Sequence, residues 1–275
     1  MVSFKKRCIS LRRLGFSLNQ IVAKTRRPKT SVYFHIQDIP LSKERKQEIR
    51  LAAIKRFNNY SKSIKGRSRL NRHPIPFDKW NDILVSLVGH LIFDGEIKHG
   101  GCVYTNRSFA LLNHVQTCME TVYPFPPKKY ESLPGVFKLG YHNVELGSFF
   151  RSKARGLLKD IQRMEKERQR IFLRAFFDDE GSVYFIGKRR AVRGYQHNSK
   201  ILNLIHHLLK NFNIESKVDK KYNEITITRK ENIECFAREI NFAVRVYING
   251  DRTNSVWKQS LEKRELLKRA LDSYR

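Results

Sequence analysis

Two stretches of the chain have apolar residues at helical spacing, and the two stretches match each other. Residues 87–95 and 173–181 both have a leucine eight positions before a glycine, and both have an acidic residue immediately before that glycine. An extended stretch rich in strand-forming residues follows each one, at residues 96–105 and 183–196. The patterns predict two apolar helices that each lead into a β-hairpin.

The match continues downstream, which indicates an internal repeat. A second helical pattern opens on Asn106 in the first copy and on Asn198 in the second. Two more candidate strands and a final helix complete each copy. These strands are residues 128–132 and 136–142 in the first copy, and 216–220 and 224–229 in the second. We expect the copies, at residues 80–162 and 163–245, to pack about an approximate two-fold axis within one chain.

Residues 1–40 carry three short apolar groups, which predict three short helices. The apolar positions are Ile9, Leu11 and Leu14 on the first helix, Leu18, Ile21, Val22 and Ala23 buried on the second, and Val32 and Ile36 buried on the third. Gly15 ends the first helix, Ser17 caps the second, and Thr30 or Ser31 lies near the start of the third. We expect a small all-α domain.

Residues 17–36 of this domain resemble a helix-turn-helix of the type found in small recombinases and regulators. The resemblance implies that the third helix enters the major groove of DNA. The residues that it would bring to the DNA are Lys29, Thr30, Ser31 and Tyr33. A basic helical hairpin that contacts only phosphates is the alternative, because helix-turn-helix patterns are short and often matched by accident.

The remaining segments are basic. Residues 41–79 predict a basic helix followed by a polar linker with Gly66, Pro74 and Pro76. Residues 246–275 predict an amphipathic basic helix from Trp257 onward, to which the sequence assigns no chemistry. The four cysteines lack the spacing of a zinc site or a disulfide framework, so we expect reduced, buried thiols.

The charge of the chain favours an anionic partner. Lys and Arg number 55 against 26 Asp and Glu, which gives a formal net charge of +29. A membrane surface would require a sustained amphipathic helix, whereas the apolar groups of the basic first segment are short and broken. We therefore expect double-stranded DNA as the partner, with no membrane and no obligate protein partner. The absence of a leader or an apolar span predicts an intracellular protein, cytoplasmic and associated with the nucleoid.

Asp94 and Glu180, the acids before the two glycines, stand where a carboxylate is disfavoured. The C-terminal end of a helix carries partial negative charge, so an acid there calls for a cation. If the two apolar helices pack side by side, the two carboxylates come together, and a divalent metal compensates their repulsion. Gly95 and Gly181 permit a sharp turn into the strand, and their carbonyls are further candidate ligands for Mg²⁺ (or Mn²⁺).

These paired motifs resemble the signature motifs of LAGLIDADG homing endonucleases in the single-chain form, over about residues 80–242. The resemblance implies an α+β fold of two pseudo-symmetric αββαββα repeats that form a DNA-binding saddle, in a chain that acts as a monomer. It also implies that Asp94 and Glu180 bind the catalytic metal of a site-specific double-strand DNA endonuclease. Phe93 and Arg174 depart from the small residues that family members often carry at those positions, which puts close helix packing in question.

Basic residues on the predicted strands are the candidate DNA contacts. In the second repeat Lys188, Arg189 and Arg190 lie at the hairpin turn, with Arg193 and Gln196 on the return strand. The resemblance also implies that basic residues on the strands assist catalysis. The candidates, each more often an ordinary phosphate contact, are Lys98, Lys138, Lys188 and Lys230. The first hairpin is short and only modestly basic, so we expect an asymmetric target.

Other readings remain open. A DNA-binding transcriptional regulator that keeps the LAGLIDADG scaffold but no longer cuts is the main alternative, and the retained acids weigh against it. An RNA-binding splicing helper on the same fold lacks a stacking-platform signature. We expect Asp178 to act in capping or polar packing more than as a second ligand. We expect His90 to be a packed or hydrogen-bonded histidine.

Overall fold

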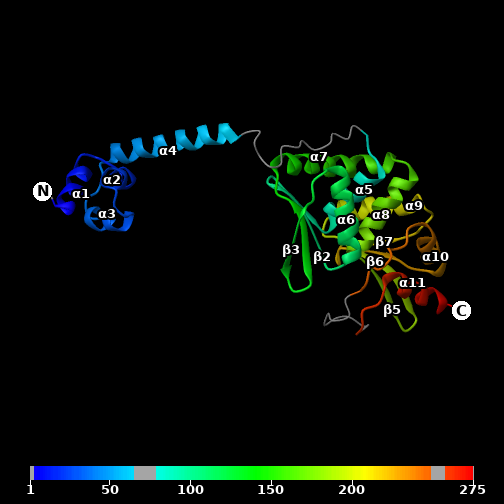
Figure 1. The fold of residues 1–275 in the computed structure, drawn as a ribbon. Coiled ribbons are helices and arrows are strands. Elements are labelled where there is room, and N and C mark those ends of the chain that lie inside the picture. The colour runs from blue at the N-terminus through cyan, green and yellow to red at the C-terminus, as the bar shows by residue number, and fades with distance from the viewer. Residues whose placement is uncertain (1–2, 65–78, 249–257, 275) are drawn as a thin grey trace. The chain divides into compact units, whose positions relative to one another are not determined.

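The computed structural model describes residues 3–64, 79–248 and 258–274. The chain divides into two compact units, residues 1–72 and 73–275 (Figure 1). Each unit has its own hydrophobic core.

The first unit is entirely helical in its described residues. Its helices are α1 (Phe4–Arg13), α2 (Leu18–Thr25), α3 (Lys29–Ile36) and α4 (Lys43–Ile64). Ser17 caps α2 in a reciprocal capping box with Gln20, as the sequence predicts for Ser17. Cys8, Ile21, Val32 and Ile36 form the buried core. Thr30 is the second residue of α3, near its start as expected, whereas Ala23 is exposed because it lies on the outer side of α2.

The second unit consists of two copies of the same element order. The first copy is α5 (Asp82–Phe93), β1 (Gly95–Lys98), β2 (Gly101–Asn106), α6 (Phe109–Val122), β3 (Lys128–Leu133), β4 (Val136–Tyr141) and α7 (Val144–Asp160), with a short 3₁₀ turn at Ile161–Arg163. The second copy is α8 (Lys166–Glu180), β5 (Gly181–Ile186), β6 (Arg189–Tyr195), α9 (Ser199–Lys210), β7 (Lys217–Asp219), β8 (Glu224–Ile227) and α10 (Lys230–Glu239), and α11 (Lys263–Asp272) follows it. Several of these helices have a side-chain N-cap, in which an oxygen accepts a backbone N–H of the first turn. The capping residues are Asn81, Ser108, Asn143 and Asn198.

The two sheets have one topology. Their strand orders are β1-β2-β4-β3 and β5-β6-β8-β7, and every neighbouring pair is antiparallel. The α+β fold with two αββαββα repeats is thereby confirmed. The register also fixes which positions correspond: Gly95 pairs with Tyr104 in the first repeat, and Gly181 pairs with Gly194 in the second.

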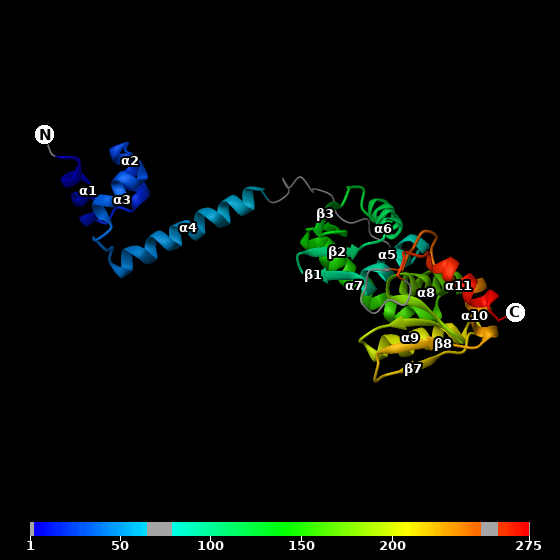
Figure 2. The same cartoon turned by 90° about the horizontal axis from the view of Figure 1, so that it is seen from below.

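Helices α5 and α8 lie side by side in the middle of the second unit (Figures 1 and 2). They approach closely at Gly89 and Ala175, where a Cβ atom on Gly89 would lie 3.1 Å from the Cβ of Ala175. Phe93 packs against aromatic rings of α8 and is 7% exposed, while Arg174 turns aside and donates from Nε to the carbonyl of Ile240 at 2.9 Å. The departures at these two positions therefore leave the helix contact close.

All four cysteines are buried and unpaired, as expected. Within residues 3–64, 79–248 and 258–274, no helix combines the length and the apolar character needed to cross a membrane.

A larger side chain at the crossing point should push α5 and α8 apart. We expect Gly89→Leu to lower the free energy of unfolding by about 1–3 kcal/mol, because a well-packed core tolerates extra volume poorly. Urea unfolding followed by circular dichroism measures the change. The control is Gly156→Ala on α7, where the nearest atom to the added Cβ is a side-chain carbon of Trp80 at 3.5 Å. The control should be neutral or slightly stabilising, and a Gly89→Leu protein as stable as this control would contradict the close crossing.

Candidate metal centre and nucleic-acid interface

The two predicted acids end the two central helices. Asp94 is the C-cap residue of α5, and Glu180 is the last residue of α8. The glycine after each acid is required by space: a Cβ atom on Gly95 would collide with the Leu91 carbonyl, and one on Gly181 with the Phe177 carbonyl. Because each strand starts directly against the end of its helix, both acids lie where helix and sheet meet.

Asp94 is held by its own repeat and crowded by the other. Its Oδ2 atom accepts a hydrogen bond from Nδ2 of Asn106 on β2 at 2.7 Å. Burial, followed by the charges of Asp179 and Glu180, raises the pKa of Asp94 to about 8. The charge of Glu180 therefore reaches Asp94 across the contact between α5 and α8.

A third acid, Asp179, raises the pKa values of both, and the sequence motifs did not identify it. Its side chain is completely buried. One oxygen lies 2.8 Å from Nδ1 of His90 on α5, and the other accepts from the hydroxyl of Tyr104 on β2 at 2.7 Å. Burial, the largest single cause, lowers the pKa of His90, but the carboxylates of Asp179, Asp178 and Asp94 together outweigh it and the pKa is raised. His90 is thus a hydrogen-bonded histidine, as predicted.

The ionised form of Glu180 is also disfavoured by its surroundings. Burial and then the charge of Asp179 raise its pKa to about 7. Opposing them is Lys263, the first residue of α11, whose side chain is buried. Its Nζ atom donates to the carbonyls of Asp178 at 2.6 Å and of Phe177 at 3.2 Å, at the C-terminal end of α8. Burial lowers the pKa of Lys263, and the surrounding acids act against that shift.

The C-terminal segment therefore differs from the sequence-based expectation. The helix begins at Lys263, well after Trp257, which lies outside the described residues. Its first residue places a cation at the negative end of α8, so the segment contacts the candidate site. Asp178 behaves as expected, because its Oδ1 atom accepts the backbone N–H of Ala243 at 2.7 Å. Burial is the main cause that raises its pKa to about 6.

The donor set suits a magnesium ion that keeps part of its water shell. Among the described residues, no three His, Cys, Asp or Glu side chains are arranged as a complete metal site. Mg²⁺ in nucleic-acid enzymes is usually held by one or two carboxylates, with waters and substrate phosphates as the other ligands. Asp94 and Glu180 meet that description, whereas both oxygens of Asp179 are already hydrogen-bonded. The carbonyls of Gly95 and Gly181 remain predicted ligands.

The first sheet presents Lys98 and Lys138 on the face opposite the helices. Pairing places Thr105 beside Lys138, and the alternate positions, such as Tyr104 and Leu139, are buried in the core. Lys98 forms an ion pair with Glu96 at 2.6 Å on the same exposed face.

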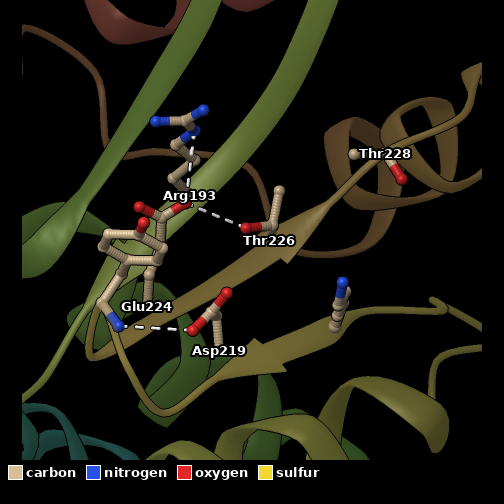
Figure 3. A pocket seen from close by; sticks show the side chains of 7 residues that line it. Arg193, Asp219, Glu224, Thr226 and Thr228 are labelled. Carbon is tan, nitrogen blue, oxygen red and sulfur yellow. Dashed lines mark hydrogen bonds and ion pairs between the residues drawn. The ribbon is translucent and has the colours of Figure 1, made fainter.

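The second sheet presents Arg193 on its corresponding face (Figure 3). Ser182, Arg193, Thr226 and Lys217 are paired in one row across the four strands. The Arg193 guanidinium stacks over the Tyr184 ring at 3.9 Å, and its Nε lies 3.3 Å from Glu224. Arg193 and Thr226 line a cavity of about 400 Å³ on this face, with the other lining residues Lys217, Asp219, Tyr222, Glu224 and Thr228.

The other predicted contacts of the second repeat lie in different places. Lys188 is in the β5–β6 turn, and Arg189 is exposed at the start of β6. Arg190 points to the helix side, where it donates to the carbonyl of Ser273 at 2.7 Å and lies over the Tyr274 ring, so we leave it out of the interface. Gln196 accepts the backbone N–H of Asn198 at 3.2 Å just after β6. Lys230 starts α10, away from the sheet, near Glu234.

In the first unit, the predicted DNA-contacting residues share the outer surface of α3. Lys29, Thr30, Ser31 and Tyr33 are all exposed. Val32 and Ile36 of the same helix are buried, so one side of α3 packs in the core and the other side is exposed to solvent.

Comparison with known proteins supports this architecture at the level of the domain. Residues 167–241 match the model of the LAGLIDADG-like domain, which covers most of the second repeat and confirms the resemblance there. No curated protein sequence matches the chain.

Solved structures show distant likenesses. The homing endonuclease I-DmoI in complex with DNA and Mn is 17% identical, with a TM-score of 0.46, over 58% of this chain and 96% of that chain. The N-terminal LAGLIDADG domain of DUF199/WhiA is 18% identical, with a TM-score of 0.46, over 62% of this chain and 88% of that chain. Full-length DUF199/WhiA from Thermatoga maritima is 16% identical, with a TM-score of 0.47, over 73% of this chain and 63% of that chain.

The crowded acids should make the metal-free protein less stable as pH rises. Asp94 has a pKa of about 8 when folded and near 3.9 when unfolded, so the folded state binds more protons between these values and the free energy of unfolding falls with pH. Asp94→Asn removes this contribution. We expect the wild type to lose stability relative to Asp94→Asn, by at most about 1.4 kcal/mol per pH unit, between about pH 5 and pH 8. Urea unfolding without divalent ions tests this, and a pH-independent difference would contradict the raised pKa.

Proposed function

We propose that the chain is a site-specific double-strand DNA endonuclease that hydrolyses phosphodiester bonds with Mg²⁺ or Mn²⁺ held by Asp94 and Glu180. The observation that carries this proposal is that the two acids stand at the ends of the contacting helices α5 and α8, with both pKa values raised. An arrangement selected only for stability would not gather acids at two negative helix ends. Attraction of both carboxylates to a bound divalent cation offsets their mutual repulsion.

Each residue of the centre has a separate task in this proposal. Asp94 and Glu180 bind the ion from the two repeats, and Asn106 fixes the rotamer of Asp94 through its 2.7 Å hydrogen bond. Lys263 holds the end of α8 in place and offsets part of the negative charge. When bound, the metal activates water and stabilises charge on the leaving oxygen.

The exposed faces of the two sheets are the proposed DNA surface. Lys98, Lys138 and Arg193 all lie on these faces, and Arg193 stands among polar side chains that can contact base edges. The exposed side of α3 in the first unit is a second, separate DNA contact. The net charge of +29 supplies the sequence-independent attraction that both surfaces need.

Cleavage of a randomised duplex library with Mg²⁺ is the direct test. The wild type should cut a defined sequence. Asp94→Asn and Glu180→Gln should each slow cleavage by about 100-fold or more, since removal of one group that stabilises developing charge has an effect of that order, while both variants still bind the selected site. Asp82→Asn at the exposed start of α5 is the matched control and should cut normally.

A wild type that binds its site tightly yet leaves it intact with Mg²⁺ and with Mn²⁺ would overturn the nuclease proposal. It would favour the second candidate, a DNA-binding regulator on the same scaffold that does not cut. One observation favours that candidate: the buried cation Lys263 already offsets part of the acidic charge without a metal.

Binding to DNA should depend steeply on salt in either case. Each phosphate that the protein neutralises contributes about −0.9 to the slope of log affinity against log salt concentration. Arg193→Ala should weaken binding and make the slope less steep by about one such contact if Arg193 touches a phosphate, or relax the sequence preference at one position if it reads a base. Arg155→Ala on the exposed side of α7 is the control. Fluorescence anisotropy with labelled duplexes at several salt concentrations provides the measurement, and a flat response would exclude nucleic acid as the partner.

A further inference from the structure

The side chain of the residue before each of the two acids, Asp94 and Glu180, reaches from its own repeat into the other. In the first repeat this residue is Phe93, before Asp94. In the second it is Asp179, before Glu180. The two occupy the same position of the repeat, yet one is a large apolar side chain and the other is a carboxylate. Both are buried where the two repeats meet.

Phe93 enters an aromatic pocket that belongs to the second repeat. Its ring centre lies 5.3 Å from that of Phe172 and 5.1 Å from that of Phe176, both on α8. Gly194 completes this pocket, because a Cβ atom there would collide with the ring of Phe176.

Asp179 enters a polar pocket that belongs to the first repeat. Its oxygens meet Nδ1 of His90 at 2.8 Å and the hydroxyl of Tyr104 at 2.7 Å. Nδ2 of Asn106 lies 3.5 Å from Asp179 and 2.7 Å from Asp94, so it lies beside both acids.

The two pockets are built at equivalent positions. His90 and Phe176 each stand five residues before the glycine of their motif. Tyr104 and Gly194 each pair with that glycine across the hairpin. The first repeat therefore carries an apolar residue and a polar pocket, and the second carries a polar residue and an apolar pocket.

We propose that this exchange is a recognition device, by which each repeat fits the other repeat of the chain and not a second copy of itself. Two first repeats would set Phe93 against His90 and Tyr104 and leave their polar atoms unsatisfied. Two second repeats would bury Asp179 among phenylalanine rings without a partner, which is more costly still. Unlike contacts of this kind give specificity by penalising the wrong pairing.

The contact between the repeats adjoins the candidate metal site, since Asn106 lies beside both Asp94 and Asp179. The inference does not depend on whether the chain cuts DNA. It concerns only how the two repeats choose each other, so its test uses stability and leaves cleavage out.

The test changes Asp179 and then its pocket in the full chain. Asp179→Phe should lower the folded-to-unfolded ratio by at least tenfold, because it leaves the polar pocket unpaired. His90→Phe with Tyr104→Gly converts that pocket toward the aromatic one of the second repeat. In this background Asp179→Phe should be tolerated, with its effect reduced by tenfold or more. Urea unfolding followed by circular dichroism gives each ratio.

Two controls make the result decisive. Asp82→Phe, an Asp→Phe change at an exposed position, should alter the ratio by less than tenfold. Asp179→Asn keeps an acceptor for Tyr104 and should stay folded even if Asp179→Phe does not, so the polar pocket can still be assessed. The proposal is overturned if Asp179→Phe costs less than tenfold, if it costs no more than Asp82→Phe, or if the converted pocket fails to reduce its effect.

Discussion

The contact between α5 and α8 is the interaction on which the rest of the second unit depends. Gly89 and Ala175 let the helices approach closely. Because both helices then end close together, the acids at their ends are brought toward each other. The close approach needs small residues at the crossing, and the two glycines at the helix ends let each strand leave at once. Packing of apolar helices thus determines where the charge gathers.

The acidic groups of the two repeats are stabilised by different contacts. Asp94 is bonded by Asn106 of its own repeat, whereas the α8 end that carries Glu180 is held from outside the repeats by Lys263. Asp179 is paired with His90 across the repeat boundary. A scaffold with one topology in both halves therefore carries a centre whose halves differ electrostatically. Duplicated topology sets the positions of the acids, and individual side chains set their protonation and orientation.

Sequence patterns were sufficient for the parts of this protein that depend on local spacing. The repeated leucine-to-glycine motif located Asp94 and Glu180 and the order of elements around them, because helix and strand periods are properties of neighbouring residues. Period-two alternation also separates two of the candidate contacts. Arg190 and Arg193 are three apart on β6 and so must face opposite sides, and Arg190 accordingly contacts Ser273.

Lys263 and Asp179 could not be found in this way, for a physical reason. Lys263 lies 83 residues beyond Glu180 in the sequence, and its contact depends on how α11 docks against the end of α8. Asp179 stands beside two other acids in the sequence, and nothing local shows that it alone reaches into the first repeat. Both side chains are buried charged groups, and their partners come from distant parts of the sequence. Because an unpaired buried charge is costly, each must have such a partner, but the sequence alone does not show which one. Each of the three consecutive acids therefore has its own compensation: Asp178 the backbone N–H of Ala243, Asp179 the side chains of the first repeat, and Glu180 the charge of Lys263. Three carboxylates in sequence remain compatible with a folded core only because the chain directs them to three different sources of compensation.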